Sequence, residues 1–96
     1  MEESILVKLK NYFKNQPVSK AWLFGLRSRD DYQIDSDYDI LVSFDDNVGL
    51  LKYSSMVLDL ENLLRKGVDL ASETALFPWV KESVNKDKTL IYEREA

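Results

Sequence analysis

In some segments of the chain, apolar residues recur every three or four positions, as they do in a helix. In others they form short runs, as they do in a strand. Residues 2–14 carry apolar side chains three and four positions apart, and Pro17 follows them, which predicts an amphipathic helix that ends before the proline. Residues 49–66 show the same spacing over a longer span, and Lys66 and Gly67 are typical of a helix C-terminus. The expected apolar stripe of this second helix consists of Leu50, Tyr53, Val57, Leu60 and Leu64, widened by Met56 and Leu63.

Short runs of β-forming residues between these helices predict strands. They are residues 21–24, 38–44, 68–71 and 89–92. Pro78 fits the first turn of a further helix over residues 78–86, and the polar cluster at 45–47 offers capping side chains to the helix at 49–66. The element order is therefore α-β-β-α-β-α-β, which indicates a single α/β (α+β) domain over residues 1–96 with helices packed on a small sheet.

The amino-acid composition limits the kinds of molecule that the chain is expected to bind. Of the 96 residues, 45% are hydrophobic, which is enough for one core of a small domain. The 13 Lys and Arg residues against 17 Asp and Glu residues give a net charge of −4, which argues against binding nucleic acid through bulk charge. No apolar run approaches the roughly 20 residues of a membrane helix. We therefore expect a soluble, cytoplasmic protein that binds neither a membrane nor nucleic acid directly.

The absence of cysteine and histidine restricts the chemistry further. Disulfides, thiolate catalysis, cysteine-ligated zinc and histidine general bases are all excluded. Any reaction must therefore use carboxylates, Lys or Arg, hydroxyl groups and the backbone. A bound metal would be a hard cation that prefers oxygen ligands, such as Mg²⁺, Mn²⁺ or Ca²⁺.

Two aspartates at the entrance of the second predicted strand are the strongest candidates for such a site. Asp37 and Asp39 are two residues apart, so on a strand their side chains share one face. Neighbouring carboxylates repel unless a cation lies between them, which leaves either a solvated edge or a clamp for a divalent metal. If the strand at 68–71 lies beside the strand at 38–44, Asp69 joins the pair. Three carboxylates could then hold two Mg²⁺ ions about 3.5–4 Å apart.

The end of the first predicted strand suggests a phosphate site. Gly25 follows residues 21–24, and a glycine there lets the backbone approach a ligand closely, with the next N–H groups free to bind phosphate oxygens. Arg27 and Arg29 have the side chains that match a phosphate group. The alternative is that both are solvated loop residues that pair with the acids at 30–31.

These features together form a longer motif. It runs Phe24-Gly25-x-Arg27-x-Arg29 and then, after a gap, Ser36-Asp37-x-Asp39, two apolar residues and Val42. The motif resembles the signature of the minimal nucleotidyltransferases, small relatives of DNA polymerase beta whose motif runs Gly-Ser-x-Ala-Arg-Gly and then Ser-Asp-x-Asp-Leu. The resemblance covers nearly the whole chain, including a strand with a third aspartate, Asp69, after the long helix.

The resemblance implies a nucleotidyltransferase fold with a small mixed β-sheet, and transfer of AMP or another nucleoside monophosphate from ATP or another NTP. It implies that Asp37 and Asp39 bind two Mg²⁺ ions, with Mn²⁺ as a substitute, and that Asp69 completes the site and accepts the proton of the acceptor hydroxyl. The expected nucleotide-binding residues are Gly25, Leu26, Arg27, Arg29 and Ser36.

Stand-alone members as short as this chain resemble antitoxins that modify a tyrosine of a HEPN-domain ribonuclease toxin. The implied partner is such a toxin, in a hetero-oligomer or with a homo-oligomer of this chain. Leu26 stands where the family has serine, and Asp30 stands where it has glycine. One phosphate hydrogen bond is worth roughly 1.5–3 kcal/mol. The alternative is therefore a weak or inactive protein of this fold that neutralises its partner by stoichiometric binding.

Overall fold

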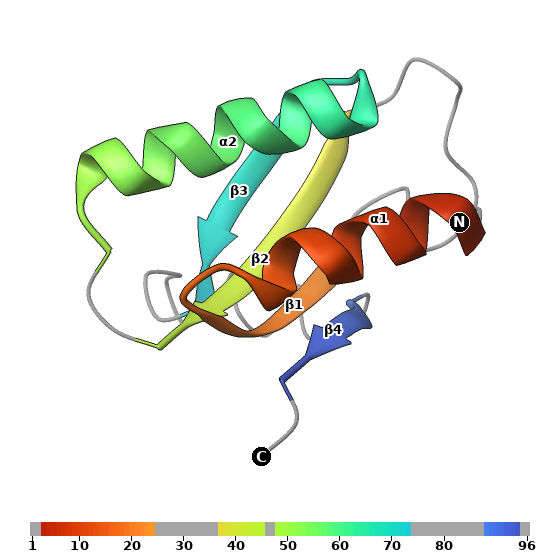
Figure 1. Ribbon diagram of the computed structural model, residues 1–96, viewed down its shortest axis with the longest axis horizontal. Helices are drawn as coiled ribbons and strands as arrows, with labels where there is room; N and C mark the ends of the chain where they lie inside the picture. The colour runs from red at the N-terminus through yellow and green to blue at the C-terminus, as the bar shows by residue number, and fades with distance from the viewer. Residues whose placement is uncertain (1–2, 25–36, 46–47, 74–87, 95–96) are drawn as a thin grey trace.

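A computed structural model describes residues 3–24, 37–45, 48–73 and 88–94 (Figure 1). Its elements are α1 (Glu3–Lys14), β1 (Val18–Phe24), β2 (Tyr38–Phe44), α2 (Leu50–Leu64), β3 (Val68–Ser72) and β4 (Thr89–Glu93). Each matches an element predicted from the sequence, although β1 begins earlier than the predicted strand at 21–24. The predicted helix at 78–86 lies outside the described residues.

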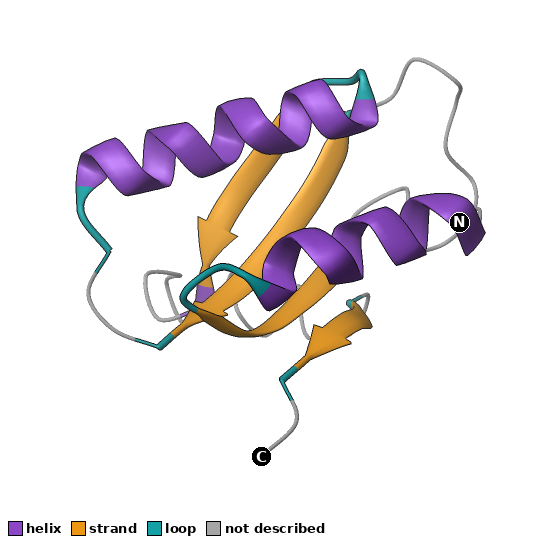
Figure 2. Ribbon diagram, viewed as in Figure 1, coloured by secondary structure: helices purple, strands orange, loops and turns teal. Residues whose placement is uncertain are grey.

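The four strands form one mixed sheet in the order β3-β2-β1-β4. β1 pairs antiparallel with β2 and with β4, whereas β2 and β3 are parallel. A parallel pair needs a crossover connection, and α2 provides it between β2 and β3. Both helices lie on the same side of the sheet, as Figure 2 shows. This mixed α/β arrangement confirms the predicted fold class.

The hydrophobic core fills the space between the helices and this side of the sheet. Its central side chains are fully buried: Leu9 and Phe13 from α1, Met56 and Leu60 from α2, and Val18, Ala21, Ile40 and Val42 from the strands. Because side chains alternate along a strand, Asp39 and Leu41 of β2 point to the other side of the sheet. Trp22 and Leu41 are also buried but lie outside this core, so they belong to that second face.

The N-terminus of α2 differs from the prediction in two ways. The residue before its first turn is Gly49, in an extended conformation, and a glycine has no side chain to act as the cap expected from residues 45–47. Leu50 is 80% exposed and is not part of the core stripe. The physical reason is visible in Figure 1, where the first turn of α2 extends past the strands, so no sheet lies beneath it. Met56, expected only to widen the stripe, is fully buried instead.

The C-terminus of α2 also differs. The residue in the left-handed conformation is Arg65, with φ 58° and ψ 32°, and its N–H donates to the carbonyl oxygen of Glu61 at 2.8 Å. The prediction that Gly67 supplies this helix end is therefore wrong. The chain turns two residues earlier, which leaves Gly67 to begin the approach to β3.

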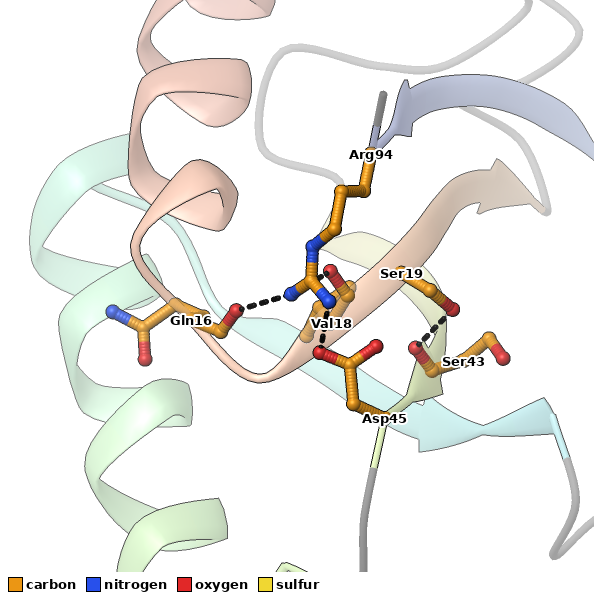
Figure 3. A network of polar contacts seen from close by, with 6 residues as sticks. All are labelled: Gln16, Val18, Ser19, Ser43, Asp45 and Arg94. Atoms are coloured by element: carbon orange, nitrogen blue, oxygen red, sulfur yellow. Dashed lines mark hydrogen bonds and ion pairs between the residues drawn. The ribbon is translucent and has the colours of Figure 1, made fainter. Parts of the chain in front are cut away.

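Arg94 connects the end of β4 to the rest of the sheet (Figure 3). Its guanidinium group forms an ion pair with Asp45, and it donates to the carbonyl oxygens of Gln16 at 3.2 Å and Val18 at 3.1 Å. Its backbone N–H donates to the carbonyl oxygen of Ser19 at 2.8 Å. These bonds join the edge strand β4 to the turn between α1 and β1.

None of the helices within the described ranges is long and apolar enough to cross a membrane.

Candidate functional site

The parallel pairing of β2 and β3 brings two of the predicted site residues together. In the register of the two strands, Asp39 lies beside Asp69. Both residues alternate with core residues, since Ile40 and Leu70 point into the helix side. The two carboxylates therefore project from the second face of the sheet, opposite α1 and α2. This confirms the expectation that the strand at 68–71 lies beside the strand that carries Asp39.

The electrostatics of this pair are unusual for two acidic side chains. The carboxyl groups of Asp39 and Asp69 stand on neighbouring register positions of the two strands, so their negative charges repel each other. Burial raises the pKa of Asp39, and the hydrogen bond and negative charge of Asp69 and the charge of Asp37 raise it further. Asp39 is half-buried, whereas Asp37 and Asp69 are exposed. The site therefore favours added positive charge, from a proton or from a cation.

Asp37 lies next to this pair, immediately before β2. The N–H of Tyr38 donates to the carbonyl oxygen of Gly67 at 2.9 Å, so the residues that precede the two strands run side by side. The side chain of Asp37 lies against the Cα of Gly67. The three candidate acids therefore gather at one end of β2 and β3.

Among the described residues, the second face also carries an aromatic side chain, Trp22, with the cation Lys88 over its ring. Phe24 of β1 pairs in register with Asp39, and Trp22 pairs with Leu41. The ammonium group of Lys88 lies 4.2 Å from the centroid of the Trp22 ring, a cation–π contact. It also lies 4.0 Å from the carboxylate of Glu73. Lys88 and Glu73 are not among the predicted site residues, because nothing in their local sequence indicates which face of the sheet they reach.

The donor set of Asp37, Asp39 and Asp69 fits a hard cation, because carboxylate oxygens are the ligands that Mg²⁺ and Mn²⁺ prefer. Among the residues that the structure describes, no group of three or more acidic side chains is placed so that it could hold a metal ion as it stands. The chemistry of the donors and the raised pKa of Asp39 therefore support a cation, and the roles of the individual ligands stay a prediction.

The predicted nucleotide-binding residues cannot be placed against this site. Gly25, Leu26, Arg27, Arg29 and Ser36 lie outside the described residues. The segment that contains them joins the end of β1 to Asp37 in the sequence, and Phe24 at the end of β1 pairs with Asp39. Their contribution to nucleotide binding stays a prediction.

Comparison with known proteins gives consistent matches. The sequence profile of the family described as "Polymerase beta, Nucleotidyltransferase" matches residues 7–96. A protein from Methanocaldococcus jannaschii, whose name places it provisionally among the protein adenylyltransferases, is 35% identical over 94 residues, which are 94% of this chain and 92% of the relative. The protein adenylyltransferase MntA of Thermococcus cleftensis is 34% identical over 86 residues, which are 88% of this chain and 87% of the relative.

The fold is also similar to a solved structure. That structure is the tri-AMPylated HEPN toxin of Shewanella oneidensis in complex with an MNT antitoxin. The matched chain has a TM-score of 0.75 at 18% identity, and the match covers 98% of this chain and 74% of that one. At this identity the similarity establishes the fold.

Proposed function

Because this chain belongs to the polymerase beta nucleotidyltransferase family, we propose that it transfers AMP from ATP to a hydroxyl group of a partner protein, with Mg²⁺ as cofactor. The observation that carries the proposal is the pairing of Asp39 with Asp69 on adjacent parallel strands, with Asp37 at the same end of the sheet. The names of the relatives from M. jannaschii and T. cleftensis support protein adenylylation as the type of reaction.

The partner that we propose is a HEPN-domain ribonuclease toxin, which this chain would neutralise as an antitoxin. The support is the fold shared with the S. oneidensis complex, in which a HEPN toxin carries AMP groups and binds an MNT antitoxin.

The acidic side chains have two tasks in the proposed reaction, which are to hold the cation and to accept a proton. The acceptor hydroxyl oxygen attacks the α-phosphorus of ATP, the bond from that phosphorus to the pyrophosphate group breaks, and the hydroxyl proton passes to Asp69. Asp37 and Asp39, with Asp69, would hold Mg²⁺, and bound Mg²⁺ would stabilise the negative charge on the phosphate oxygens. Of the three, Asp39 is the side chain that is half-buried, and it lies within β2.

The nucleotide would lie between these acids and the segment after β1. Gly25, Leu26, Arg27, Arg29 and Ser36 are the residues that we propose for the triphosphate. Arg27 and Arg29 supply positive charge, and the backbone N–H groups near Gly25 supply neutral donors. Leu26 cannot donate a side-chain hydrogen bond, which lowers the expected affinity for ATP.

A second candidate function follows from that same substitution. With Leu26 in place of serine and Asp30 in place of glycine, the chain would bind and silence its partner without modifying it. In this case the charge of the acidic site would be irrelevant to neutralisation. The two functions therefore predict different behaviour for variants that remove the carboxylates.

The test is the intact mass of the co-expressed HEPN partner after incubation of the complex with ATP and Mg²⁺. We expect mass increments of one or more AMP groups with the wild-type chain and none with the Asp37→Asn/Asp39→Asn variant. Asp59→Asn is the matched control, because Asp59 lies on α2, on the other side of the sheet, and its amide can still accept the hydrogen bond from Tyr12. A stable complex with no mass increment for any version would contradict AMP transfer and support stoichiometric binding.

A further inference from the structure

Gly67 lies between α2 and β3, where a glycine would ordinarily be explained by the end of the helix. That explanation does not hold here. Arg65 adopts the left-handed conformation that ends α2, whereas the φ angle of Gly67 lies outside the left-handed region. Any L-residue could adopt the backbone conformation of residue 67. The reason for a glycine must therefore lie in what surrounds its Cα.

The side chain of Asp37 occupies the space where a Cβ atom would be. A Cβ atom built on Gly67 would lie 2.7 Å from Oδ1, 2.9 Å from Cγ and 3.2 Å from Oδ2 of Asp37. The first two distances are shorter than real Cβ atoms show. For comparison, a Cβ atom built on Gly49 would have no atom within 4 Å. Of the two glycines that the structure describes, only Gly67 therefore has such a close approach.

The backbone at this point has little freedom to relieve the contact. The N–H of Tyr38 donates to the carbonyl oxygen of Gly67 at 2.9 Å, and the β2–β3 ladder starts at the next pair, Tyr38 beside Val68. The side chains of Tyr38 and Val68 are both buried in the core. The carboxylate of Asp37 is exposed, so it is the group that would move if residue 67 had a side chain.

We propose that Gly67 is a positioning residue for the candidate cation site: it leaves open the space that the carboxylate of Asp37 occupies, from which its charge acts on Asp39. The inference rests on the proposed function, because it assigns Asp37 a place in a divalent-cation site. A methyl group at position 67 would displace this carboxylate from the position that it occupies now. Ligand-positioning residues of this kind change metal affinity by about 10–100-fold when they are altered.

The proposal predicts that Gly67→Ala changes metal affinity and fold stability to different extents. The exposed carboxylate can rotate into solvent, so Gly67→Ala should leave the stability of the fold nearly unchanged. The same substitution should lower the affinity for a divalent cation about tenfold or more. If Gly67 were needed only for the backbone conformation of the connection between α2 and β3, the substitution would lower the melting temperature. The metal affinity of the protein that remains folded would then be unchanged.

The experiment uses the full chain and Mn²⁺ as the probe, with binding followed by electron paramagnetic resonance of the free ion. The variants are Gly67→Ala, the control Gly49→Ala, Asp37→Ala, and the Asp37→Ala/Gly67→Ala double variant. We expect Gly67→Ala to weaken Mn²⁺ binding about tenfold or more and Gly49→Ala to have no effect. In the Asp37→Ala background, Gly67→Ala should cause no further loss, because the group that it displaces is gone.

Two results would overturn the inference: equal Mn²⁺ affinity for Gly67→Ala and wild type, or an equal loss with and without the Asp37 carboxylate. A wild-type chain that binds no Mn²⁺ would instead contradict the proposed function. In that case the ¹³C resonance of the Asp37 carboxyl carbon tests, without any metal, whether residue 67 positions this carboxylate. It should shift in Gly67→Ala and stay in place in Gly49→Ala, and an unshifted resonance in Gly67→Ala would overturn the inference.

Discussion

Asp39 of β2 and Asp69 of β3 lie side by side, in register, on two parallel strands. Burial raises the pKa of Asp39 above its ordinary value, and the neighbouring carboxyl group of Asp69 raises it further. The fold therefore forces two like charges together and raises the demand for positive charge at one end of the sheet. A site built in this way suits a protein that binds a divalent cation.

The first prediction concerns stability as a function of pH in the presence of a chelator. The pKa of Asp39 is raised above its ordinary value of 3.8, so the folded state holds the proton to higher pH than the unfolded state does. The contribution of Asp39 to stability should therefore fall as the pH rises from about 4 through its raised pKa. The Asp39→Asn variant should show a flatter profile and greater stability at pH 7, measured by urea unfolding. An identical pH profile for the two proteins would contradict the raised pKa.

The second prediction concerns divalent cations and thermal stability. A ligand that binds only the folded state at 100 times its dissociation constant adds about 2.7 kcal/mol. For a domain of this size, each 1 kcal/mol raises the melting temperature by about 4–8 °C. We expect saturating Mn²⁺ to raise the melting temperature of the wild type and to have little effect on the Asp39→Asn/Asp69→Asn variant. Asp59→Asn, on the helix side of the sheet, should respond as the wild type does.

The third prediction compares two leucines on the same helix. Leu60 of α2 is fully buried in the core, whereas Leu58 is 60% exposed. Leu60→Ala should lower the free energy of unfolding by about 2–5 kcal/mol, because it removes apolar contacts and leaves a cavity. Leu58→Ala should change it by no more than about 0.5 kcal/mol. Urea denaturation of the two variants measures both values, and equal losses would mean that α2 packs on the sheet through another face.

The fourth prediction concerns the hydrogen bond between the two helices. The hydroxyl of Tyr12 on α1 donates to the carboxylate of Asp59 on α2 at 2.9 Å. Burial, together with the hydrogen bond and the negative charge of Asp59, raises the pKa of Tyr12 above the ordinary range for tyrosine. Tyr12→Phe should lower the free energy of unfolding at pH 7 by about 0.5–1.5 kcal/mol.

The pH dependence of the Tyr12→Phe effect provides its control. The unfolded state loses the Tyr12 proton near pH 10, while the folded state keeps it to higher pH. The wild type should therefore lose more stability than Tyr12→Phe as the pH rises above 10. A constant difference in stability between the two proteins from pH 9 to 11 would show that Asp59 does not affect the ionisation of Tyr12.

Local sequence determined most of the secondary structure. Hydrophobic spacing at the helical period indicated α1 and α2, and runs of β-forming residues indicated all four strands, because these patterns reflect which side chains can be buried together. The two-residue spacing of Asp37 and Asp39 indicated that their side chains share one face at the same end of β2. The absence of cysteine and histidine determined the hard, oxygen-rich chemistry of the candidate site.

Tertiary structure decided what depends on contacts between distant segments. The parallel pairing of β2 with β3 places Asp69 beside Asp39. From the sequence alone, this neighbourhood could be expected only if the two strands were assumed to be adjacent. The exposure of Leu50 depends on where the sheet ends beneath α2. Gly67 has the sequence context of a helix end, yet its Cα lies against the side chain of Asp37. A local pattern shows which conformations a residue can adopt, but only the packed chain shows which other residue fills the space beside it.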